Sequence, residues 1–305
     1  MKKVIVTGSN GFLGTALCKE LSSRGINVIA IVRNKQENIS EICNLPNLKI
    51  IYCDMSDFYK LHELIIDRDI DVLYHFAWVG SSGQLRGNWD VQVNNIKYTC
   101  QTVLACSALN CKRFVFAASI MENEITTFME SSLVPNINSL YSSAKIAADY
   151  MARTIAGSMG IKFIRALISN IYGPGEYSPR LINTSIRKML SGEHCAFSLG
   201  NQIYDFIYIT DAVRSFIALG EKGIANRTYY IGSLNPRPLK EFLVAMRDTV
   251  NPNLELRLGE INISGTPANY NEIDIEALKN DTGVVPKVSF TEGIVNTAKW
   301  IKENM

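Results

Sequence analysis

Tyr141 and Lys145 stand four residues apart on a stretch whose apolar residues recur at helical spacing. On a helix they share one face and lie about 6 Å apart along its axis. A phenol is a poor base at neutral pH, but a nearby ammonium group stabilises its phenolate. Ser119 ends a predicted strand and can orient a substrate oxygen beside the phenol. These three residues predict a site that moves a proton to or from that oxygen.

A second group of residues, the glycine motif GSNGFLG at 8–14, is typical of a phosphate-binding turn. It lies between the apolar run 4–6 and an amphipathic stretch, which are the strand and helix that the motif requires. Gly8 permits a tight turn, Gly11 lets the backbone approach a pyrophosphate, and Gly14 lets the helix lie close to the strand. The helix N-terminus offers free N–H groups to the phosphates. We expect a dinucleotide cofactor to contact Gly8, Asn10, Gly11, Phe12, Leu13 and Gly14.

The end of the second predicted strand bears on which dinucleotide binds. Sites that prefer NAD usually place an acid there, which accepts a hydrogen bond from the ribose 2′-OH. This chain has Arg33, Asn34 and Lys35 instead, and an arginine can bind a 2′-phosphate through two hydrogen bonds. We therefore expect NADP(H), with NAD(H) as the second choice. In the other interpretation, Arg33 and Lys35 belong to a solvated loop.

Asp54 and Met55 follow the third predicted strand. At that position an acid can accept from the adenine amino group, so both residues are expected at the cofactor. Asp54 can equally cap the next helix, and the sequence leaves the two roles open.

The order of the elements predicts an α/β fold of the Rossmann type, a doubly wound parallel sheet with helices on both faces. Apolar runs typical of strands buried on both sides alternate with amphipathic runs over the first 170 residues. Strands are expected at 4–6, 28–32, 49–52, 72–75, 113–117 and 162–166. Helices are expected at 13–23, 57–67, 91–109 and 140–159.

This rhythm changes after residue 175, where Gly, Pro and polar residues become more frequent. We expect a dinucleotide-binding domain over residues 1–175. A smaller, loop-rich C-terminal lobe over 176–305 is expected to supply a substrate-binding pocket. Part of that lobe, at about 203–230, is expected to return to the main domain.

Composition and charge narrow the function classes. The formal net charge of +2 over 305 residues gives no general electrostatic reason to bind nucleic acid or an acidic membrane. No apolar run reaches the roughly 18 residues that a membrane span needs. Seven dispersed cysteines without a CxxC spacing, and only three histidines, make a disulfide framework or a metal site unexpected. These features predict a cytoplasmic protein with reduced thiols and no metal.

Several further segments resemble signatures of the extended short-chain dehydrogenase/reductase family, in its nucleotide-sugar epimerase, dehydratase and reductase branch. The resemblance covers essentially the whole chain. Besides the glycine motif and the Tyr/Lys pair, it rests on HFAW at 75–78, NIKYT at 95–99, NIYGP at 170–174, DFIYITD at 205–211 and FTEGI at 290–294.

This resemblance implies roles for individual residues. Tyr141 is the implied acid/base and Lys145 the group that lowers its pKa, and Ser119 completes the catalytic trio. In the family-like signatures at 75–78 and 95–99, the residues implied to contact the cofactor are Phe76, Ala77 and Asn95.

The resemblance also implies a nucleotide-sugar substrate. Asn170 stands where the family's asparagine touches the sugar diphosphate. The family's arginine before DFI contacts the nucleotide phosphates, but this chain has Tyr204 there, which can hydrogen-bond a phosphate but cannot neutralise it. Arg180 or Arg187 can supply the charge, and we favour Arg180. Trp78 is expected to line the substrate pocket, unless it only stabilises its own loop.

One departure from the family pattern bears on the reaction. The 4,6-dehydratases of this branch carry Thr-Asp-Glu after the fifth strand, and the two acids eliminate water. Aligned on Ser119, this chain has Ile120 and Met121 in place of those acids. Glu122 and Glu124 follow one and three residues late. The pattern therefore argues against elimination.

Two reactions remain after elimination is set aside. A 4-epimerase keeps NAD⁺ and usually has the acid after the second strand, whereas a ketoreductase takes hydride once from exchangeable NADPH. Arg33, with no acid beside it, favours a reductase of a nucleotide-linked 4-keto-6-deoxy sugar. The alternatives are an NAD-dependent nucleotide-sugar 4-epimerase and a non-catalytic dinucleotide-binding regulator. The regulator is disfavoured because Tyr141 and Lys145 are both retained.

The two long helices expected at 91–109 and 140–159 bear on assembly. By resemblance they pair with their twofold copies in a homodimer. The second of them carries a face of small and aliphatic residues, which permits close helix packing. The same residues can instead pack only on their own sheet.

Overall fold

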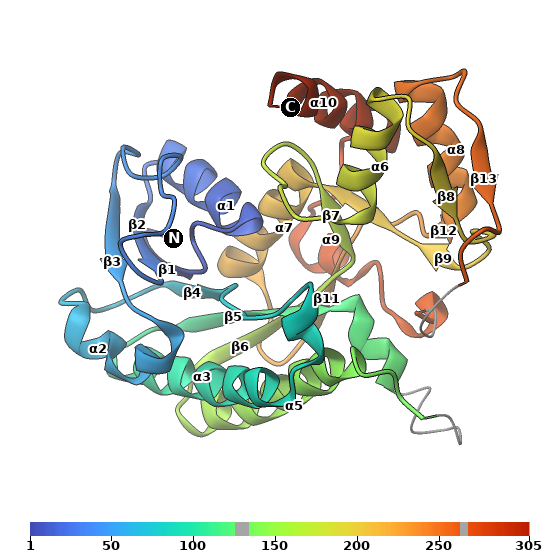
Figure 1. The fold of residues 1–305 in the computed structure, drawn as a ribbon. Coiled ribbons are helices and arrows are strands. Elements are labelled where there is room, and N and C mark those ends of the chain that lie inside the picture. Colours follow the sequence, from blue (N-terminus) through green and yellow to red (C-terminus); the bar gives the residue numbers. More distant parts are fainter. Residues whose placement is uncertain (126–133, 263–267, 305) are drawn as a thin grey trace.

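The computed structural model describes residues 1–125, 134–262 and 268–304. Its centre is a parallel sheet of seven strands in the order β11-β6-β5-β4-β1-β2-β3. Their bounds are β1 (Lys3–Thr7), β2 (Asn27–Val32), β3 (Leu48–Tyr52), β4 (Val72–His75), β5 (Arg113–Ser119), β6 (Lys162–Ile168) and β11 (Thr228–Ile231). The α/β sheet expected from the sequence is confirmed, and Figure 1 shows helices on both of its faces.

The strand order reverses next to β1. The chain moves from β1 to β2 and β3 on one side, and then crosses to β4, β5 and β6 on the other. Ligands of open α/β sheets bind outside the carboxyl ends of the strands at such a switch point. The glycine motif follows β1 at this point.

Alternate residues of each strand face opposite sides of the sheet. Val4 and Val6 join an apolar cluster with Leu17 of α1 (Phe12–Ser23). Ile5 joins the opposite cluster, to which Ala152 of α5 (Ser139–Ser158) belongs. The first face is covered by α1 and α7 (Ile209–Lys222), and the second by α3 (Trp89–Ala108) and α5 (Ser139–Ser158) (Figure 1).

The second expected helix, at 57–67, is much shorter than the sequence suggests. The structure has a 3-10 helix, η1 (Met55–Lys60), followed by one turn of helix, α2 (Leu61–Leu64). The backbone becomes extended at Ile65. The guanidinium of Arg68 then binds the carbonyls of His62 and Ile66 at 3.2 and 3.1 Å, so backbone acceptors at the end of the turn are satisfied without further helix.

Residues from 170 onward form a smaller group of elements beside the sheet. Its strands occur in pairs: β7 (Asn170–Tyr172) with β10 (Phe206–Tyr208), β9 (Ile203–Tyr204) with β12 (Arg237–Pro238), and β8 (Cys195–Phe197) with β13 (Leu256–Leu258). Its helices are α6 (Leu181–Leu190), α8 (Leu239–Val250), α9 (Ala277–Thr282) and α10 (Phe290–Glu303). Short 3-10 turns occur both before residue 170, at η2 (Gln84–Gly87) and η3 (Ile120–Glu122), and after it, at η4 (Tyr270–Glu272).

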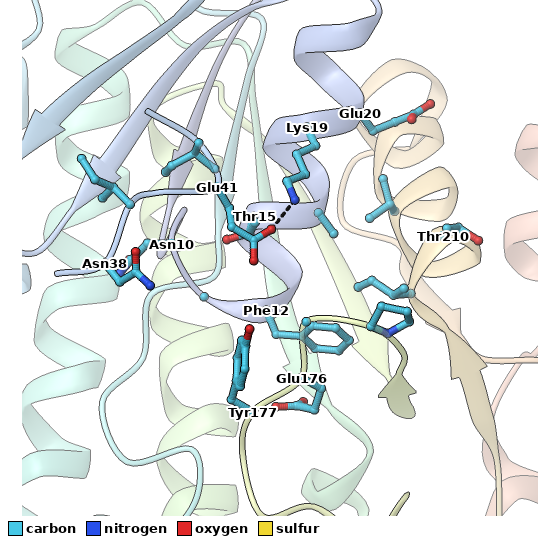
Figure 2. Close-up of a pocket in the computed structure, with 18 of the residues that line it drawn as sticks. Asn10, Phe12, Thr15, Lys19, Glu20, Asn38, Glu41, Glu176, Tyr177 and Thr210 are labelled. Atoms are coloured by element: carbon cyan, nitrogen blue, oxygen red, sulfur yellow. Dashed lines mark hydrogen bonds and ion pairs between the residues drawn. The ribbon is translucent and has the colours of Figure 1, made fainter. Parts of the chain in front are cut away.

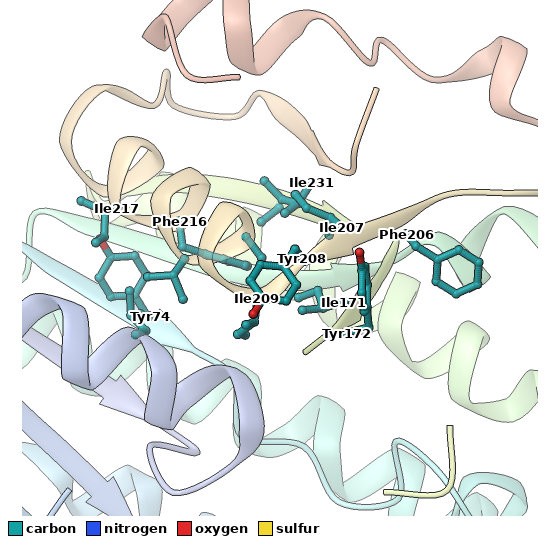
Figure 3. Close-up of a cluster of buried hydrophobic side chains, with 14 of the residues drawn as sticks. Tyr74, Ile171, Tyr172, Phe206, Ile207, Tyr208, Ile209, Phe216, Ile217 and Ile231 are labelled. Atoms are coloured by element: carbon teal, nitrogen blue, oxygen red, sulfur yellow. The ribbon is translucent and has the colours of Figure 1, made fainter. Parts of the chain in front are cut away.

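The chain returns from this group to the central sheet. After β10 it forms α7 against α1, and β11 then pairs in parallel with β6. One continuous apolar cluster joins the two parts: Figure 3 shows Tyr74 of β4, Phe216 of α7, and Tyr172 and Phe206 of the neighbouring pair of strands within it. The sheet and the smaller group of elements therefore share a core.

The packing of α1 on the glycine motif yields a stability prediction. A Cβ at Gly14 would lie 2.1 Å from the Gly8 carbonyl oxygen, whereas Gly157 of α5 has nothing within 4 Å. We expect Gly14→Ala to lower the free energy of unfolding by about 1–3 kcal/mol, because backbone must move. Gly157→Ala should raise it by about 0.5–1 kcal/mol, because alanine favours a helix. Urea denaturation measures both changes, and effects of the same sign would contradict this packing.

Candidate active site

The glycine motif forms a cradle between β1 and α1. Gly8 has a φ of +65°, and a Cβ there would lie 2.9 Å from the Ala77 nitrogen. The motif is fixed by hydrogen bonds from Gly11 N–H to the Gly8 carbonyl at 3.1 Å and from the Ser9 hydroxyl to the Ile31 carbonyl at 2.9 Å. At the start of α1, the N-cap Gly11 offers no side-chain cap. The first N–H groups of α1 are therefore available to a phosphate, and the cradle fits a dinucleotide.

A carboxylate that the sequence analysis missed lies beside Arg33. Glu37 forms an ion pair with Arg33 at 2.6 Å and accepts from the amide of Asn10 at 3.2 Å. Arginine and acid thus stand together after β2, close to the glycine motif. The acid comes four residues after Arg33, later than the position where a strand-end acid is expected, and only the folded loop brings it near.

Asp54 caps η1. Its carboxylate accepts from the Ser56 amide at 2.9 Å and from the Ser56 hydroxyl at 2.8 Å. The cap, one of the two roles that the sequence left open, is therefore present. Met55 is buried in the core beneath it.

The segment after β4 is held by buried polar side chains. The Thr7 hydroxyl accepts from the amides of Phe76 and Ala77, both at 3.2 Å, and bonds His75 at 3.0 Å. Burial lowers the pKa of His75 to about 3, so it is neutral. Asn95 is fully buried and binds both the N–H and the carbonyl of Val79, at 3.0 and 2.8 Å. Asn95 thus fixes this loop from behind.

Ser119, Tyr141 and Lys145 meet in one cavity of about 530 Å³. Ser119 is the last residue of β5, and the other two lie one turn apart on α5. Burial raises the pKa of Tyr141 above that of a free phenol, and a hydrogen bond with Ser119 opposes only part of this rise. Lys145 donates to the Ala117 carbonyl at 2.8 Å, and burial lowers its pKa to about 7.

The same cavity gathers most of the other residues that the sequence singled out. Those on the cofactor side are Gly8, Gly11, Phe12, Leu13, Gly14 and Phe76; those on the substrate side are Trp78, Asn170, Arg180 and Tyr204. The cofactor residues outside its lining are Asn10, Arg33, Asp54, Met55, Ala77 and Asn95.

The residues that follow Ser119 place no carboxylate in this cavity. Ile120 and Met121 line it with apolar side chains. Glu122 is turned into the protein, where it accepts from the Ser119 amide at 2.7 Å and pairs with Arg165. Glu124 is buried and accepts from the Ser142 hydroxyl. Neither carboxylate lines the cavity.

Of the two arginines expected at the substrate, Arg180 lines the cavity with its guanidinium 3.6 Å from Glu176. Arg187 does not line it, but donates to Asn183 of its lining at 3.2 Å. The Asn170 amide donates to the Asp205 carbonyl at 3.0 Å. The sequence analysis missed Arg86 of η2, which also lines the cavity. Its loop position gave no periodic signal that could have found it.

The Trp78 side chain lies against Tyr141 and Lys145. Its ring is 3.7 Å from the Lys145 ammonium and packs edge-to-face with Tyr141 at 6.0 Å between centroids. Its indole N–H donates to Gln92 at 3.1 Å. Trp78 therefore both lines the cavity and binds the residues that hold its own loop. The sequence analysis had treated these two roles as alternatives.

A second cavity, of about 920 Å³, also has Phe12 in its lining (Figure 2). It is lined by α1, the start of α7, and the segments 37–42 and 174–178. Figure 2 shows Lys19 reaching across it to Glu41, with which it forms an ion pair. Asn10, Gly11 and Phe12 line it at the glycine motif. The two cavities therefore meet at the start of α1.

Two further findings concern residues 1–125, 134–262 and 268–304. No helix in these ranges is both long and apolar enough to cross a membrane. Nor do they contain a group of three or more His, Cys, Asp or Glu side chains suited to hold a metal ion.

Comparisons with known proteins agree with this geometry. Residues 4–232 match the model of the NAD dependent epimerase/dehydratase family. The chain is 24% identical to dTDP-D-glucose 4,6-dehydratase of Bos taurus, over 99% of this chain and 89% of the relative. It superposes on UDP-glucuronic acid 4-epimerase from Bacillus cereus with a TM-score of 0.80 and 22% identity, over 99% and 100% of the two chains. UDP-glucose 4-epimerase from Thermotoga maritima gives 0.81 and 19%, over 99% of each. At these identities the solved structures support the fold.

The buried ion pairs behind Ser119 yield a pH prediction. Arg165 pairs with Glu122, and its Nε lies 3.3 Å from Asp149. Burial raises the pKa of both carboxyl groups and Arg165 opposes that rise. A carboxyl whose pKa is raised in the folded state favours folding while it is protonated, and this contribution is lost as the pH rises through that pKa. Arg165→Met should therefore cost about 3–5 kcal/mol of unfolding free energy at pH 8 and less at pH 5.

Urea denaturation at the two pH values measures this difference. The double variant Glu122→Gln/Arg165→Met is the control, because it removes the carboxylate that loses its arginine, whereas Asp149 still pairs with Arg153. It should recover part of the loss at pH 8. A loss in Arg165→Met that is equal at pH 5 and pH 8 would show that packing, and not charge, accounts for it.

Proposed function

Because the chain belongs to the NAD dependent epimerase/dehydratase family, we propose that it is an NADP(H)-dependent reductase of a nucleotide-linked 4-keto sugar, with a 6-deoxy sugar as the favoured substrate. The observation that carries the choice of reductase is Arg33, which directly follows β2 where NAD sites usually have an acid. The cavity shared by Ser119, Tyr141 and Lys145 supports the chemistry.

In this proposal, different residues of the cavity bind the keto oxygen, protonate it and stabilise the charge that remains. The bound cofactor supplies hydride to the carbonyl carbon. The Ser119 hydroxyl and the Tyr141 phenol donate hydrogen bonds to the oxygen, and Tyr141 gives up its proton as the alcohol forms. Lys145 holds the cofactor ribose and stabilises the phenolate until solvent returns the proton. Asn170, Arg180 and Tyr204 face the sugar diphosphate.

The apolar residues after Ser119 support the sugar assignment. Elimination of water needs an acid and a base beside the reacting carbons, and Ile120 and Met121 offer neither. We therefore do not propose the dehydratase activity that the name of the Bos taurus relative carries. An apolar wall beside the reacting carbon is suited to the methyl group of a 6-deoxy sugar.

The second candidate is an NAD-dependent nucleotide-sugar 4-epimerase. Glu37 favours it, because a carboxylate that bonds Asn10 and Arg33 stands near the glycine motif and can accept from a ribose 2′-OH. The Bacillus cereus 4-epimerase is described in complex with NAD. A non-catalytic regulator is the weakest reading, since the Tyr/Lys pair is intact.

The deciding experiment is to identify the dinucleotide in freshly purified protein and to measure its exchange. Empty protein that binds NADPH far better than NADH supports the reductase. Oxidation of NADPH by the wild-type protein in the presence of a nucleotide-linked 4-keto-6-deoxy sugar, and loss of this activity in Tyr141→Phe, would establish the reductase. Stoichiometric NAD⁺ that does not exchange overturns the reductase in favour of the epimerase. Binding of neither cofactor overturns the cofactor assignment.

A variant tests the role of Arg33 directly. Arg33→Ala should weaken NADPH binding by about 10–100-fold, since a hydrogen bond to a charged group contributes ~1.5–3 kcal/mol, and it should leave NADH binding within about twofold. Fluorescence titration measures both affinities. Lys35→Ala removes a neighbouring cation and is the control. Equal loss for NADPH and NADH in Arg33→Ala would contradict a contact with the 2′-phosphate.

We also infer a cytoplasmic homodimer from surface features. The seven cysteines are free thiols, which suits a reducing compartment. Exposed apolar side chains lie on α3 (Val93 and Leu104) and on α5 (Tyr150 and Met151). A second copy of the chain packing on these helices would cover them.

Two substitutions of equal exposure test the dimer. Met151 on α5 and Val295 on α10 are each 52% exposed. We expect Met151→Glu to produce a monomer, because it places a charge in the interface, and Val295→Glu to remain a dimer. Light scattering after gel filtration gives the mass of each. A wild-type monomer, or two dimeric variants, would contradict the proposed interface.

A further inference from the structure

The loop between β4 and α3 is built to hold Arg86 in one place. Gly80 has a φ of +71°, and a Cβ there would lie 2.6 Å from the Leu85 carbonyl oxygen, so the loop closes tightly on itself. The Gln92 amide ties its two sides together through the carbonyls of Gly80 and Leu85, at 3.2 and 3.1 Å. Arg86 itself donates to the Ser81 carbonyl at 3.3 Å. Its position is therefore set by backbone contacts.

From this loop Arg86 covers the phenol of Tyr141. The guanidinium carbon lies 4.4 Å from the centroid of the Tyr141 ring, within the range of a cation–π contact. Both side chains line the 530 Å³ cavity. In the part of the chain that the structure describes, no carboxylate forms an ion pair with Arg86, so its charge faces the cavity and the ring.

Lys145 is directed away from Tyr141 by comparison. Its ammonium donates to the Ala117 carbonyl at 2.8 Å and lies 3.7 Å from the Trp78 ring, but 6.0 Å from the centroid of the Tyr141 ring. Burial also lowers the pKa of Lys145 to about 7, so near neutral pH it is charged only part of the time. A guanidinium keeps its charge at every pH in this range.

The remaining charged groups around Tyr141 are few. Glu122 on η3 opposes ionisation of the phenol, and Arg180, just before α6, favours it together with Arg86. Glu122 is already paired with Arg165, and Arg180 lies 3.6 Å from Glu176. Arg86 is the cation among them that contacts the phenol ring.

We propose that Arg86 is a positioning residue that supports the acid/base role of Tyr141 by stacking a permanent positive charge on its ring. The inference rests on the proposed role of Tyr141 as the proton donor. When the phenol gives its proton to the substrate oxygen, the negative charge left on Tyr141 is stabilised by Arg86 as well as by Lys145. The phenolate is then replaced by the phenol when solvent returns a proton.

The test measures the titration of Tyr141 without any substrate. The protein is labelled with 3-fluorotyrosine, which lowers phenol pKa values, and the ¹⁹F resonance of Tyr141 is identified as the one missing from Tyr141→Phe. Arg86→Gln should raise the midpoint of this titration by about one pH unit, a tenfold loss of phenolate at a given pH. Arg86→Lys should restore at least half of the shift. Arg257→Gln, which removes a half-exposed cation from β13, should leave the midpoint unchanged.

Two outcomes would overturn the proposal. One is a Tyr141 midpoint in Arg86→Gln that matches that of Arg257→Gln. The other is an equal shift in Arg86→Gln and Arg86→Lys, which would show that the loop's packing matters and its charge does not. Thermal unfolding of each variant confirms that it is folded. If Arg86→Gln does not fold, the Tyr141 midpoint of Arg86→Lys is compared with that of the wild-type protein: a rise of at most about half a pH unit supports the proposal, and a rise of about one pH unit overturns it. Because no substrate is used, the result does not depend on whether reductase activity is found.

Discussion

The parallel direction of all seven strands is the constraint on which the rest of this structure depends. Parallel neighbours can be joined only by crossover connections that run back along a face of the sheet, so helices must cover both faces. The carboxyl ends of β1, β4, β5 and β6 then lie along one edge, and the cavity residues Gly8, Phe76, Ser119 and Ser169 end or directly follow these strands. The phosphate cradle and the phenol come together because of strand direction, although about 130 residues separate them.

The sequence was most informative where local pattern and tertiary structure agree. Strands buried on both faces need unbroken apolar runs, so the six expected strands of the central sheet are found. The pair at Tyr141 and Lys145 needed only helical spacing to be placed on one face. The helix expected at 57–67 was wrong, because Arg68 satisfies carbonyls that a longer helix would have used. Such a contact has no periodic signature.

Contacts between a loop and a distant element also leave no pattern in the sequence. For this reason the contacts of Glu37, Arg86 and Glu122 could not be predicted. Each depends on a loop that brings a side chain next to a residue from another element: Glu37 to Asn10, Arg86 to Tyr141, and Glu122 to Arg165. Glu122 could be recognised from the sequence as a misplaced acid, but not as the group that holds the Ser119 amide. The departure from the family pattern after Ser119 therefore argued against elimination of water. The structure then showed that Glu122 instead holds the Ser119 amide and pairs with Arg165.

The return of the chain to β11 limits how the molecule can be divided. A polypeptide that stopped at residue 175 would contain the glycine motif, Ser119, Tyr141 and Lys145, yet it would leave the long hydrogen-bonding edge of β6 without its partner. It would also uncover the face of β4 and α1 on which α7 packs. An unpaired apolar edge of this kind recruits other strands, so residues 1–175 on their own should aggregate. Domain exchange between related chains would have to carry residues 206–231 together with the first half.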